Sequence, residues 1–293
     1  MPEIAFVNGR FMPLKDAMVP VEDRGFQFGD GVYEVIRTYG GALFQLDAHL
    51  ARLERSAMAI ALANPFSLKE WQGHIEAGIH RAGFAESKVY LQLTRGVAPR
   101  DHQYPEGTAP TAVITIREMR SMDPTGRAIG IEAITLEDVR WGRCDIKSVN
   151  LLANIMARQR AKEAGAFEAI FVRQGMVTEG AVSNVMVIRK GVLITPPEGP
   201  AILSGVTRRL VLHLANMEGL VVREQEIDVS AFFAVDEMFL TGTTVEVLPM
   251  VRVDRRPIGT GRPGELSRLL SARFDELVRG ELMSGQEPLH RAD

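Results

Sequence analysis

One lysine stands out as the residue that could form a covalent bond to a carbonyl compound. Six of the 34 Lys and Arg residues are lysines, and five of these lie in polar, turn-like or helix-surface surroundings: Lys15, Lys69, Lys88, Lys162 and Lys190. Lys147 instead follows an extended segment and precedes Leu151-Leu152, which opens an apolar helix. Burial disfavours the ammonium form, and Schiff-base chemistry requires a neutral amine. Lys147 is therefore a candidate nucleophile, and the alternative is an ordinary lysine that pairs with Asp145.

Other residues could bind an anion. Ser204-Gly205 precedes a helix expected to begin near Val206, so the free amides of Val206 and Thr207 would lie at the positive end of that helix. Arg52 lies off the apolar stripe of an earlier helix that Asp47 could cap, so it points at solvent or into a cleft. A guanidinium suits phosphate oxygens because its donors form a planar fork. The alternative for Arg52 is a solvated surface charge.

A loop bounded by proline carries two cationic side chains. Arg100 and His102 lie between Ala98-Pro99 and Pro105, and residues 98–105 are called the arm loop below. Polar loop residues more commonly face solvent, but two donors placed two residues apart favour a binding role. The arm loop is thus a candidate substrate-binding segment.

Two other kinds of site are not indicated. Gly259-Thr-Gly-Arg-Pro-Gly264 matches the glycine pattern of dinucleotide-binding loops, but it follows Arg255-Arg256-Pro257 rather than an apolar strand, which favours a turn. The histidines show no metal-ligand spacing and the chain has one cysteine, Cys144, so no metal site is expected.

Bulk composition is that of an ordinary globular protein. The 293 residues are 46% hydrophobic and 24% charged, and the formal net charge is −3. This balance does not indicate a nucleic-acid or membrane surface, and no apolar run approaches the roughly 20 residues that span a bilayer. The first residues lack the layout of a signal peptide, and the single cysteine fits a cytoplasmic location.

The hydrophobic patterns predict two α/β domains. In the first, residues 1–120, Asn8-Gly9 and Gly40-Gly41 mark hairpins. Residues 121–127 form the expected linker, and the second domain, residues 128–293, begins shortly before Lys147. Helices are expected at 47–60, 68–82, 150–164, 206–218 and 265–279, and strands at 88–94, 111–118, 130–136, 169–173, 185–189 and 237–241.

Six blocks of sequence, in order along the chain, carry a family resemblance. They are residues 22–34, Thr94-Arg-Gly, residues 100–105, residues 140–152, Thr178-Glu-Gly180 with Ser183-Asn-Val185, and Thr241-Gly-Thr-Thr244. Together they resemble the fold type IV (class IV) aminotransferases, which use pyridoxal 5′-phosphate, and are most similar to the bacterial D-amino-acid aminotransferases. The resemblance implies a two-domain α/β fold with a smaller N-terminal and a larger C-terminal domain.

The resemblance also implies roles in cofactor binding. Lys147 would form the Schiff base and move the α-proton, and Glu179 would face the pyridine nitrogen, although a surface-turn carboxylate is the alternative for Glu179. Leu203 would pack on one face of the ring, unless it is plain core. The residues expected to contact the phosphate are Arg52, Val206, Thr207 and Thr243.

Substrate binding would depend on four further residues. The resemblance implies that Tyr33, Arg100 and His102 hold the substrate carboxylate, with Val35 beside them. It also implies that Arg100 and His102 reach in from the neighbouring subunit of a homodimer. The expected reaction is ping-pong transfer of an amino group between D-amino acids of the D-alanine type and 2-oxo acids such as 2-oxoglutarate or pyruvate.

The sequence departs from the family pattern at two places. Ala181-Val182 replaces a serine-rich pair, and Gly242 stands where the D-specific relatives carry serine. These changes leave substrate range open. The alternatives are an R-selective amine transaminase, a branched-chain L-amino-acid aminotransferase, an aminodeoxychorismate lyase, or a catalytically silent ligand-binding dimer.

Overall fold

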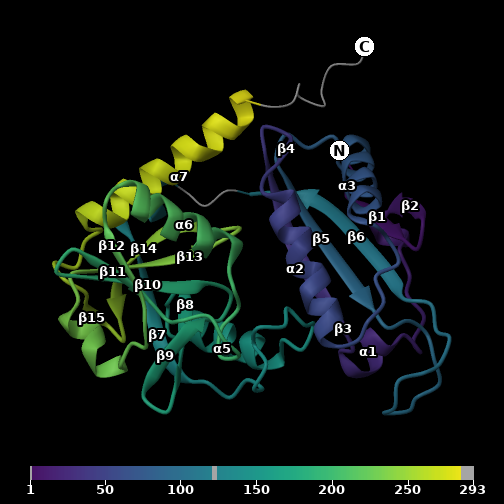
Figure 1. Ribbon diagram of the computed structural model, residues 1–293, viewed down its shortest axis with the longest axis horizontal. Coiled ribbons are helices and arrows are strands. Elements are labelled where there is room, and N and C mark those ends of the chain that lie inside the picture. The colour runs from purple at the N-terminus through teal and green to yellow at the C-terminus, as the bar shows by residue number, and fades with distance from the viewer. Residues whose placement is uncertain (1, 121–123, 285–293) are drawn as a thin grey trace. The chain divides into compact units, whose positions relative to one another are not determined.

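The structure is a computed structural model that describes residues 2–120 and 124–284. Contacts divide the chain into two compact mixed α/β units (Figure 1). Among the described residues, the first unit holds 2–120, 146–150 and 280–284, and the second holds 124–145 and 151–279. Of the predicted linker, residues 121–123 lie outside the described residues, and the remainder opens a short helix, α4 (Pro124–Ile129), rather than an irregular segment.

An antiparallel sheet forms the base of the first unit. Among the described residues its six strands run in the order β2-β1-β6-β5-β3-β4. Both predicted hairpin turns are confirmed, because Asn8, Gly9, Gly40 and Gly41 all have positive φ. The strands are β1 (Ile4–Val7), β2 (Arg10–Pro13), β3 (Gly31–Tyr39), β4 (Ala42–Leu43), β5 (Ser87–Thr94) and β6 (Thr111–Glu118).

Two helices, α2 (Leu46–Ala59) and α3 (Leu68–Ala82), cover one face of this sheet (Figure 1). Their apolar stripes pack on the alternate strand residues that point to the same face, such as Ile36. Helix α3 ends where predicted, at Gly83 with φ 69°. Asp47 does not cap α2 as expected: the chain turns at Gln45 with φ 55°, so Asp47 falls inside the first helical turn.

The segment that carries Lys147 groups with the first unit and not with the second, where the sequence placed it. The reason is hydrogen bonding to β3: Tyr33 N donates to Lys147 O at 2.9 Å, and Val149 N donates to Gly31 O at 3.1 Å. The chain therefore returns to the first unit for residues 146–150 and then re-enters the second unit at Leu151. This short excursion has no hydrophobic periodicity of its own, which is why the sequence pattern did not show it.

The second unit is built on a larger mixed sheet. Its nine strands, among the described residues, follow the order β12-β11-β10-β13-β14-β7-β8-β9, with β15 paired to β14. Helix α5 (Leu152–Glu163) packs on β8 through Ala157 and Ala161, and α6 (Val206–Met217) and residues 265–279 of α7 (Glu265–Ser284) complete the unit. The strands are β7 (Ile131–Glu137), β8 (Glu168–Arg173), β9 (Met176–Gly180), β10 (Asn184–Arg189), β11 (Val192–Thr195), β12 (Val221–Glu224), β13 (Glu237–Gly242), β14 (Glu246–Val253) and β15 (Arg256–Pro257).

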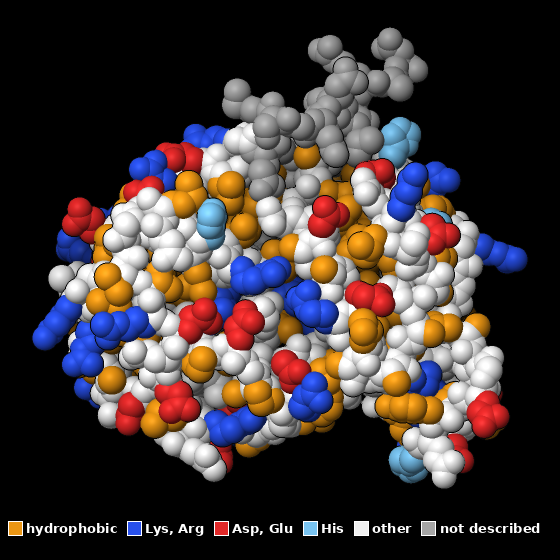
Figure 2. Space-filling model, in the orientation of Figure 1, with side chains coloured by type: hydrophobic (Ala, Val, Ile, Leu, Met, Phe, Trp, Pro, Cys, Tyr) orange, Lys and Arg blue, Asp and Glu red, His pale blue; other side chains and the backbone are white. Residues whose placement is uncertain are grey.

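The surface carries charges of both signs. Lys and Arg side chains are interspersed with Asp and Glu on the face in Figure 2. None of the described helices is long and apolar enough to cross a membrane. Within residues 2–120 and 124–284, no group of three or more His, Cys, Asp or Glu side chains is arranged to hold a metal ion. The segment Gly259–Gly264 is the turn between β15 and α7, as the sequence indicated.

Candidate active site

Lys147 is held by its backbone between a strand and a helix of the first unit. Its carbonyl accepts from Tyr33 N of β3, and its N–H donates to Ser56 Oγ of α2 at 3.2 Å. The side chain is half-buried, and Nζ lies 4.3 Å from the centroid of the Tyr33 ring. The predicted partial desolvation of Lys147 is therefore present, and its partner at close range is an aromatic face.

Arg52 is buried, which excludes the alternative of a solvated surface charge. Its Nε donates to Glu34 Oε1 at 2.6 Å and its Nη2 donates to Glu34 Oε2 at 2.8 Å. His49 Nδ1 lies 2.8 Å from Glu34 Oε2. The three side chains form a buried polar cluster of the first unit.

Burial and neighbouring charges shift the pKa values of two members of this cluster. Burial raises the pKa of Glu34, but the charge and hydrogen bonds of Arg52 and His49 outweigh burial and hold that pKa well below its usual range. Burial lowers the pKa of His49, against the opposing effect of Glu34. The cluster is thus a carboxylate–guanidinium pair beside a histidine that burial keeps towards its neutral form.

The sequence carries one indication of this buried polar cluster. His49, Arg52 and Ser56 are spaced i, i+3 and i+7, so they form a polar stripe on α2 beside the apolar stripe. Glu34 lies in the middle of β3 with its side chain fully buried, and only the pairing of β3 with α2 reveals its partner.

Tyr33 and Val35 lie on the face of β3 opposite Glu34, because strand side chains alternate. The register places Tyr33 opposite Gln92 and Val35 opposite Tyr90 on β5. The Tyr33 and Tyr90 rings stack with centroids 5.6 Å apart. Burial, with a smaller contribution from the neighbouring Tyr33, raises the pKa of Tyr90 to about 12. The two predicted substrate residues thus share a half-buried surface with Tyr90 and Gln92, which the sequence did not single out.

Arg100 and His102 are exposed on the arm loop, as predicted, and one aromatic ring lies under both. The Arg100 guanidinium is 4.4 Å from the centroid of Phe28, and the His102 ring centroid is 5.5 Å from the same ring. Phe28 ends the short helix α1 (Arg24–Phe28). The structure therefore brings the Arg100 and His102 side chains together over one ring.

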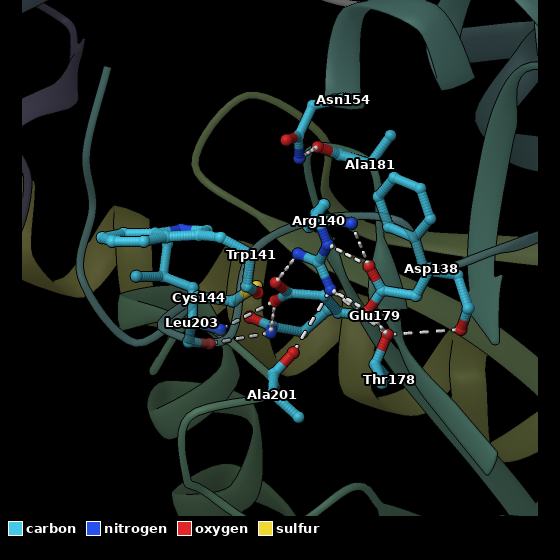
Figure 3. Close-up of polar contacts among 12 residues, drawn as sticks. Asp138, Arg140, Trp141, Cys144, Asn154, Thr178, Glu179, Ala181, Ala201 and Leu203 are labelled. Atoms are coloured by element: carbon cyan, nitrogen blue, oxygen red, sulfur yellow. Dashed lines mark hydrogen bonds and ion pairs between the residues drawn. The ribbon is translucent and has the colours of Figure 1, made fainter. Parts of the chain in front are cut away.

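Glu179 lies in the second unit on β9 and is buried, which excludes the surface-turn alternative. Its Oε1 accepts from Arg140 Nη1, and its Oε2 accepts from Asn184 Nδ2 at 3.0 Å and from Leu203 N at 2.9 Å (Figure 3). Leu203 thus holds Glu179 through its backbone N–H, and its side chain is half-buried. The strand β9 escaped the sequence analysis because Val177-Thr-Glu-Gly180 is short and lacks clear alternation.

Arg140 lies between two carboxylates, as Figure 3 shows. Its Nε and Nη2 each donate to an oxygen of Asp138 at 2.9 Å, while Nη1 donates to Glu179. Burial lowers the pKa of Arg140, but the Asp138 hydrogen bond and the Glu179 charge raise it above its usual value. Burial likewise raises the pKa of Asp138, and Arg140 outweighs that effect and lowers it. Arg140 opens the resemblance block at residues 140–152, and Asp138 lies two residues before it, but the sequence alone gave neither residue a role.

Helix α6 begins at Val206, as predicted, and its N-cap Gly205 provides no side-chain cap. Val206 and Thr207 are both buried. A Cβ at Gly205 would lie 2.1 Å from Asn184 Oδ1, so the residue that holds Glu179 also requires glycine at this helix start. Asn184 Nδ2 further donates to Leu203 O at 2.9 Å. Asn184 therefore links the Glu179 carboxylate to the N-terminus of α6.

The Thr241–Thr244 segment lies beside the same asparagine. Asn184 of β10 and Thr241 of β13 are directly paired in the sheet. Thr241 Oγ1 is buried and has no hydrogen-bond partner among the described residues, and Thr243 follows in the turn after β13. The second unit thus gathers Glu179, Leu203, the start of α6 and Thr241 around Asn184.

Comparison with known proteins gives the family. The class IV aminotransferase model matches residues 31–253. A D-alanine aminotransferase from Bacillus licheniformis is 43% identical over 274 residues, covering 94% of this chain and 96% of that protein. Another from Listeria monocytogenes is 40% identical over 283 residues, with coverage of 94% and 98%.

Solved structures agree on the fold. A branched-chain amino-acid aminotransferase from Escherichia coli has a TM-score of 0.89 at 25% identity, covering 96% of each chain. A second branched-chain amino-acid aminotransferase, from T.th. and solved with pyridoxamine 5′-phosphate, has a TM-score of 0.88 at 27% identity, covering 96% of this chain and 95% of that one. The chain belongs to the class IV aminotransferase family, and it is an aminotransferase of fold type IV.

Proposed function

We propose that this aminotransferase uses pyridoxal 5′-phosphate to transfer amino groups between D-amino acids and 2-oxo acids, with D-alanine and 2-oxoglutarate or pyruvate as the natural substrates. The observation that carries the substrate class is the arm loop, where Arg100 and His102 lie over one ring, that of Phe28. Two adjacent cationic donors suit the carboxylate of an amino acid. The names of the similar proteins from Bacillus licheniformis and Listeria monocytogenes support the D-alanine assignment.

The residues of each unit fit parts of this cofactor. In the second unit, the uncapped start of α6 and the unpartnered Thr241 Oγ1 offer donors for a phosphate, with Thr243 alongside. Glu179 is a buried carboxylate held by three donors, as a partner for a protonated ring nitrogen should be. In the first unit, Arg52 supplies a buried guanidinium and Lys147 a half-buried amine.

When bound, pyridoxal phosphate supplies an aldehyde for covalent attachment and a ring that accepts the electrons left at the substrate α-carbon. Lys147 anchors the cofactor, and its Nζ carries the α-proton. Glu179 would hold a proton on the ring nitrogen, and the hydrogen bond from Arg140 orients Glu179. Leu203 packs on the ring, and Arg52, Val206, Thr207 and Thr243 bind the phosphate.

Selectivity for the D enantiomer follows from the position of the carboxylate. Lys147 removes a proton from one side only, so the enantiomer that reacts is the one whose hydrogen points to Lys147. Tyr33, Arg100 and His102 fix that choice by binding the carboxylate, and Val35 lines the same strand face. The neutral Tyr90 beside Tyr33 adds no negative charge, because its pKa is raised to about 12.

The protein acts as a homodimer in this proposal, with the arm loop completing the neighbouring subunit's site. Several large apolar side chains of the first unit are exposed, among them Met18, Val21 and Phe26. Such exposure supports a surface that the second subunit would cover. Val97, next to the arm loop, is also exposed, and it bridges to Asp23 just before α1. A cytoplasmic location belongs to the proposal too, because the single cysteine leaves no internal disulfide.

A chiral substrate panel tests the proposal. D-alanine, L-alanine, D- and L-leucine and (R)-1-phenylethylamine are each offered with 2-oxoglutarate, and D-alanine is expected to react fastest. Faster turnover of L-leucine would instead assign the branched-chain specificity that the solved relatives carry in their names, and faster turnover of the amine would assign an amine transaminase. A protein that binds the cofactor on Lys147 but reacts with none of these would be the silent ligand-binding dimer.

A further inference from the structure

Asp30, the second residue after α1, receives hydrogen bonds from two buried arginines. Arg24 Nε donates to Asp30 Oδ2 at 2.8 Å, and Arg95 donates from Nε and Nη2 to the two oxygens at 2.8 and 3.0 Å. Burial raises the pKa of Asp30, but the two arginines outweigh burial and lower it. Asp30 is therefore a carboxylate that neutralises two guanidinium groups placed side by side.

Each of these arginines also contacts the arm loop. Arg24 Nη1 donates to the carbonyl oxygen of Asp101, the residue between Arg100 and His102, at 2.5 Å. The Arg95 guanidinium lies 3.6 Å from the centroid of the Tyr104 ring, near the other end of the loop. One carboxylate thus fixes the two cations that hold the loop at two points.

The donors that remain on Arg95 bind elsewhere in the first unit. Its Nη1 and Nη2 donate to the carbonyl oxygens of Ala61 and Ile60, at 2.9 and 2.8 Å, just after α2. Arg95 N also donates to Asp30 O at 3.1 Å. Arg95 is therefore fixed to the helix–sheet framework, and Asp30 aligns Arg24 with it.

We propose that Asp30 is a positioning residue that sets the Arg100–His102 pair for the substrate carboxylate. The inference rests on the proposed function, because it needs the arm loop to bind that carboxylate. Without the Asp30 charge, Arg24 and Arg95 would repel each other, and Arg24 would release Asp101. The loop would then sample positions in which Arg100 and His102 no longer share the Phe28 ring, and affinity for a carboxylate would fall while chemistry at Lys147 would not.

The test compares two substrates that differ only in the carboxylate. Asp30→Asn keeps the shape and removes the charge. It is expected to raise KM for D-alanine about tenfold with kcat within about twofold, as loss of one charged hydrogen-bond network predicts. D-Alaninol has a hydroxymethyl group in place of the carboxylate, and its single-turnover rate, followed by cofactor absorbance, should stay unchanged. Asp30→Glu restores a carboxylate and should recover part of the lost affinity.

Glu86→Gln is the matched control. Like Asp30, Glu86 is an acidic residue near an arginine: its Oε2 lies 3.9 Å from Arg37 Nη2. Its Oε1 accepts a hydrogen bond from Gly40 N, just after the end of β3. Its substitution should leave both substrates unaffected. The Arg95 contact is tested separately: Tyr104→Phe keeps an aromatic face and should preserve KM, whereas Tyr104→Ala should raise it.

A second measurement does not depend on activity. Arg100 lies in an exposed loop, so trypsin can cleave after it, and a loosened loop in Asp30→Asn should be cut several times faster than in Glu86→Gln. Equal cleavage rates together with an unchanged KM for D-alanine would overturn the inference. So would an Asp30→Asn variant that slows D-alaninol as much as D-alanine, because Asp30 would then only stabilise the fold.

Arg100→Ala separates failure of this inference from failure of the proposed function. If Arg100→Ala raises KM for D-alanine and Asp30→Asn does not, the arm loop binds substrate but Asp30 does not position it. If Arg100→Ala leaves KM for D-alanine unchanged, the arm loop does not bind the carboxylate. The proposed function then loses its carrying observation, and the role of Asp30 falls with it.

Discussion

Replacing Arg140 should show how much its ion pairs with Glu179 and Asp138 contribute to the free energy of unfolding. Arg140 donates to Glu179 and to both oxygens of Asp138, and its guanidinium lies 4.4 Å from the centroid of the Phe171 ring. The side chains of Asp138 and Glu179 are 0% and 7% exposed, so neither can turn to water if Arg140 is removed. Arg140→Met keeps most of the apolar stem and removes only the charged group.

The magnitude follows from burial. Removing one partner of a buried ion pair costs about 3–5 kcal/mol, because the remaining charge stays buried without compensation. Arg173 also contacts Asp138, at 3.1 Å, so Asp138 retains one cation and the expected loss lies at the lower end of that range. Arg143, three residues along the chain, pairs with Asp145 at 2.8 Å, but the two side chains are 50% and 35% exposed. Arg143→Met is therefore the control, and its loss of stability should be much smaller, because water screens an exposed pair.

The pH dependence gives the sharper test. Arg140 lowers the pKa of Asp138 in the folded protein, so this carboxylate stabilises the fold above its unfolded pKa, and the stabilisation is lost as pH falls through the folded pKa. In Arg140→Met the pKa of Asp138 is no longer lowered by Arg140, so the deficit relative to wild type should be largest well above pH 3.8 and smaller once the pH falls below 3.8. Urea denaturation of the cofactor-free protein at fixed protein concentration measures the deficit on both sides of this pH. A deficit no larger than that of Arg143→Met, or one equal on the two sides, would refute this account of Arg140.

Three further outcomes are expected. Because burial lowers the pKa of His49 from 6.5, the unfolded chain takes up a proton that the folded one does not, so wild-type stability should fall as pH drops below 6.5 and His49→Gln should flatten that slope in urea titrations. Glu179→Gln should retain the cofactor but slow α-proton removal in single turnovers, by the equivalent of about 2–4 kcal/mol, and an unchanged rate would contradict its role. Mixing Lys147→Ala with Arg100→Ala subunits should regenerate one intact site per heterodimer, and exchanged mixtures without activity would argue against a shared site.

Local signals predicted the local structure well. The hairpin at Asn8-Gly9 and the helix end at Gly83 follow from residues that tolerate positive φ, and both are confirmed. The start of α6 at Val206 is also confirmed: its N-cap Gly205 has an extended backbone with φ −69° and ψ 133°, and glycine is among the residues favoured at that position. Each of these features depends on two or three neighbouring residues, which is the range over which a single sequence is informative.

Contacts between distant residues were beyond such signals. Arg52 looked like a solvated charge because its partner, Glu34, lies on β3, 18 residues earlier in the chain. Glu179 looked like a turn residue because β9 is only five residues long and its pairing with β8 is irregular. In both cases the deciding fact is a buried partner on another element. A helix stripe that carries His49, Arg52 and Ser56 could have indicated that such a partner existed, but not which residue it was.

The packing of α1 brings two blocks of the resemblance, residues 22–34 and Thr94-Arg-Gly, next to each other in the first unit. Asp23 caps α1 through Gly25 N and accepts from Thr94 Oγ1, so residues 22–30 and 94–96 are joined side by side. A Cβ at Gly25 would lie 2.3 Å from Thr94 Cγ2, so this approach requires glycine. The same junction carries Asp30 and Arg95, which hold the arm loop. The two blocks are therefore held together by the geometry around a helix of five residues, without any need for contact with the substrate.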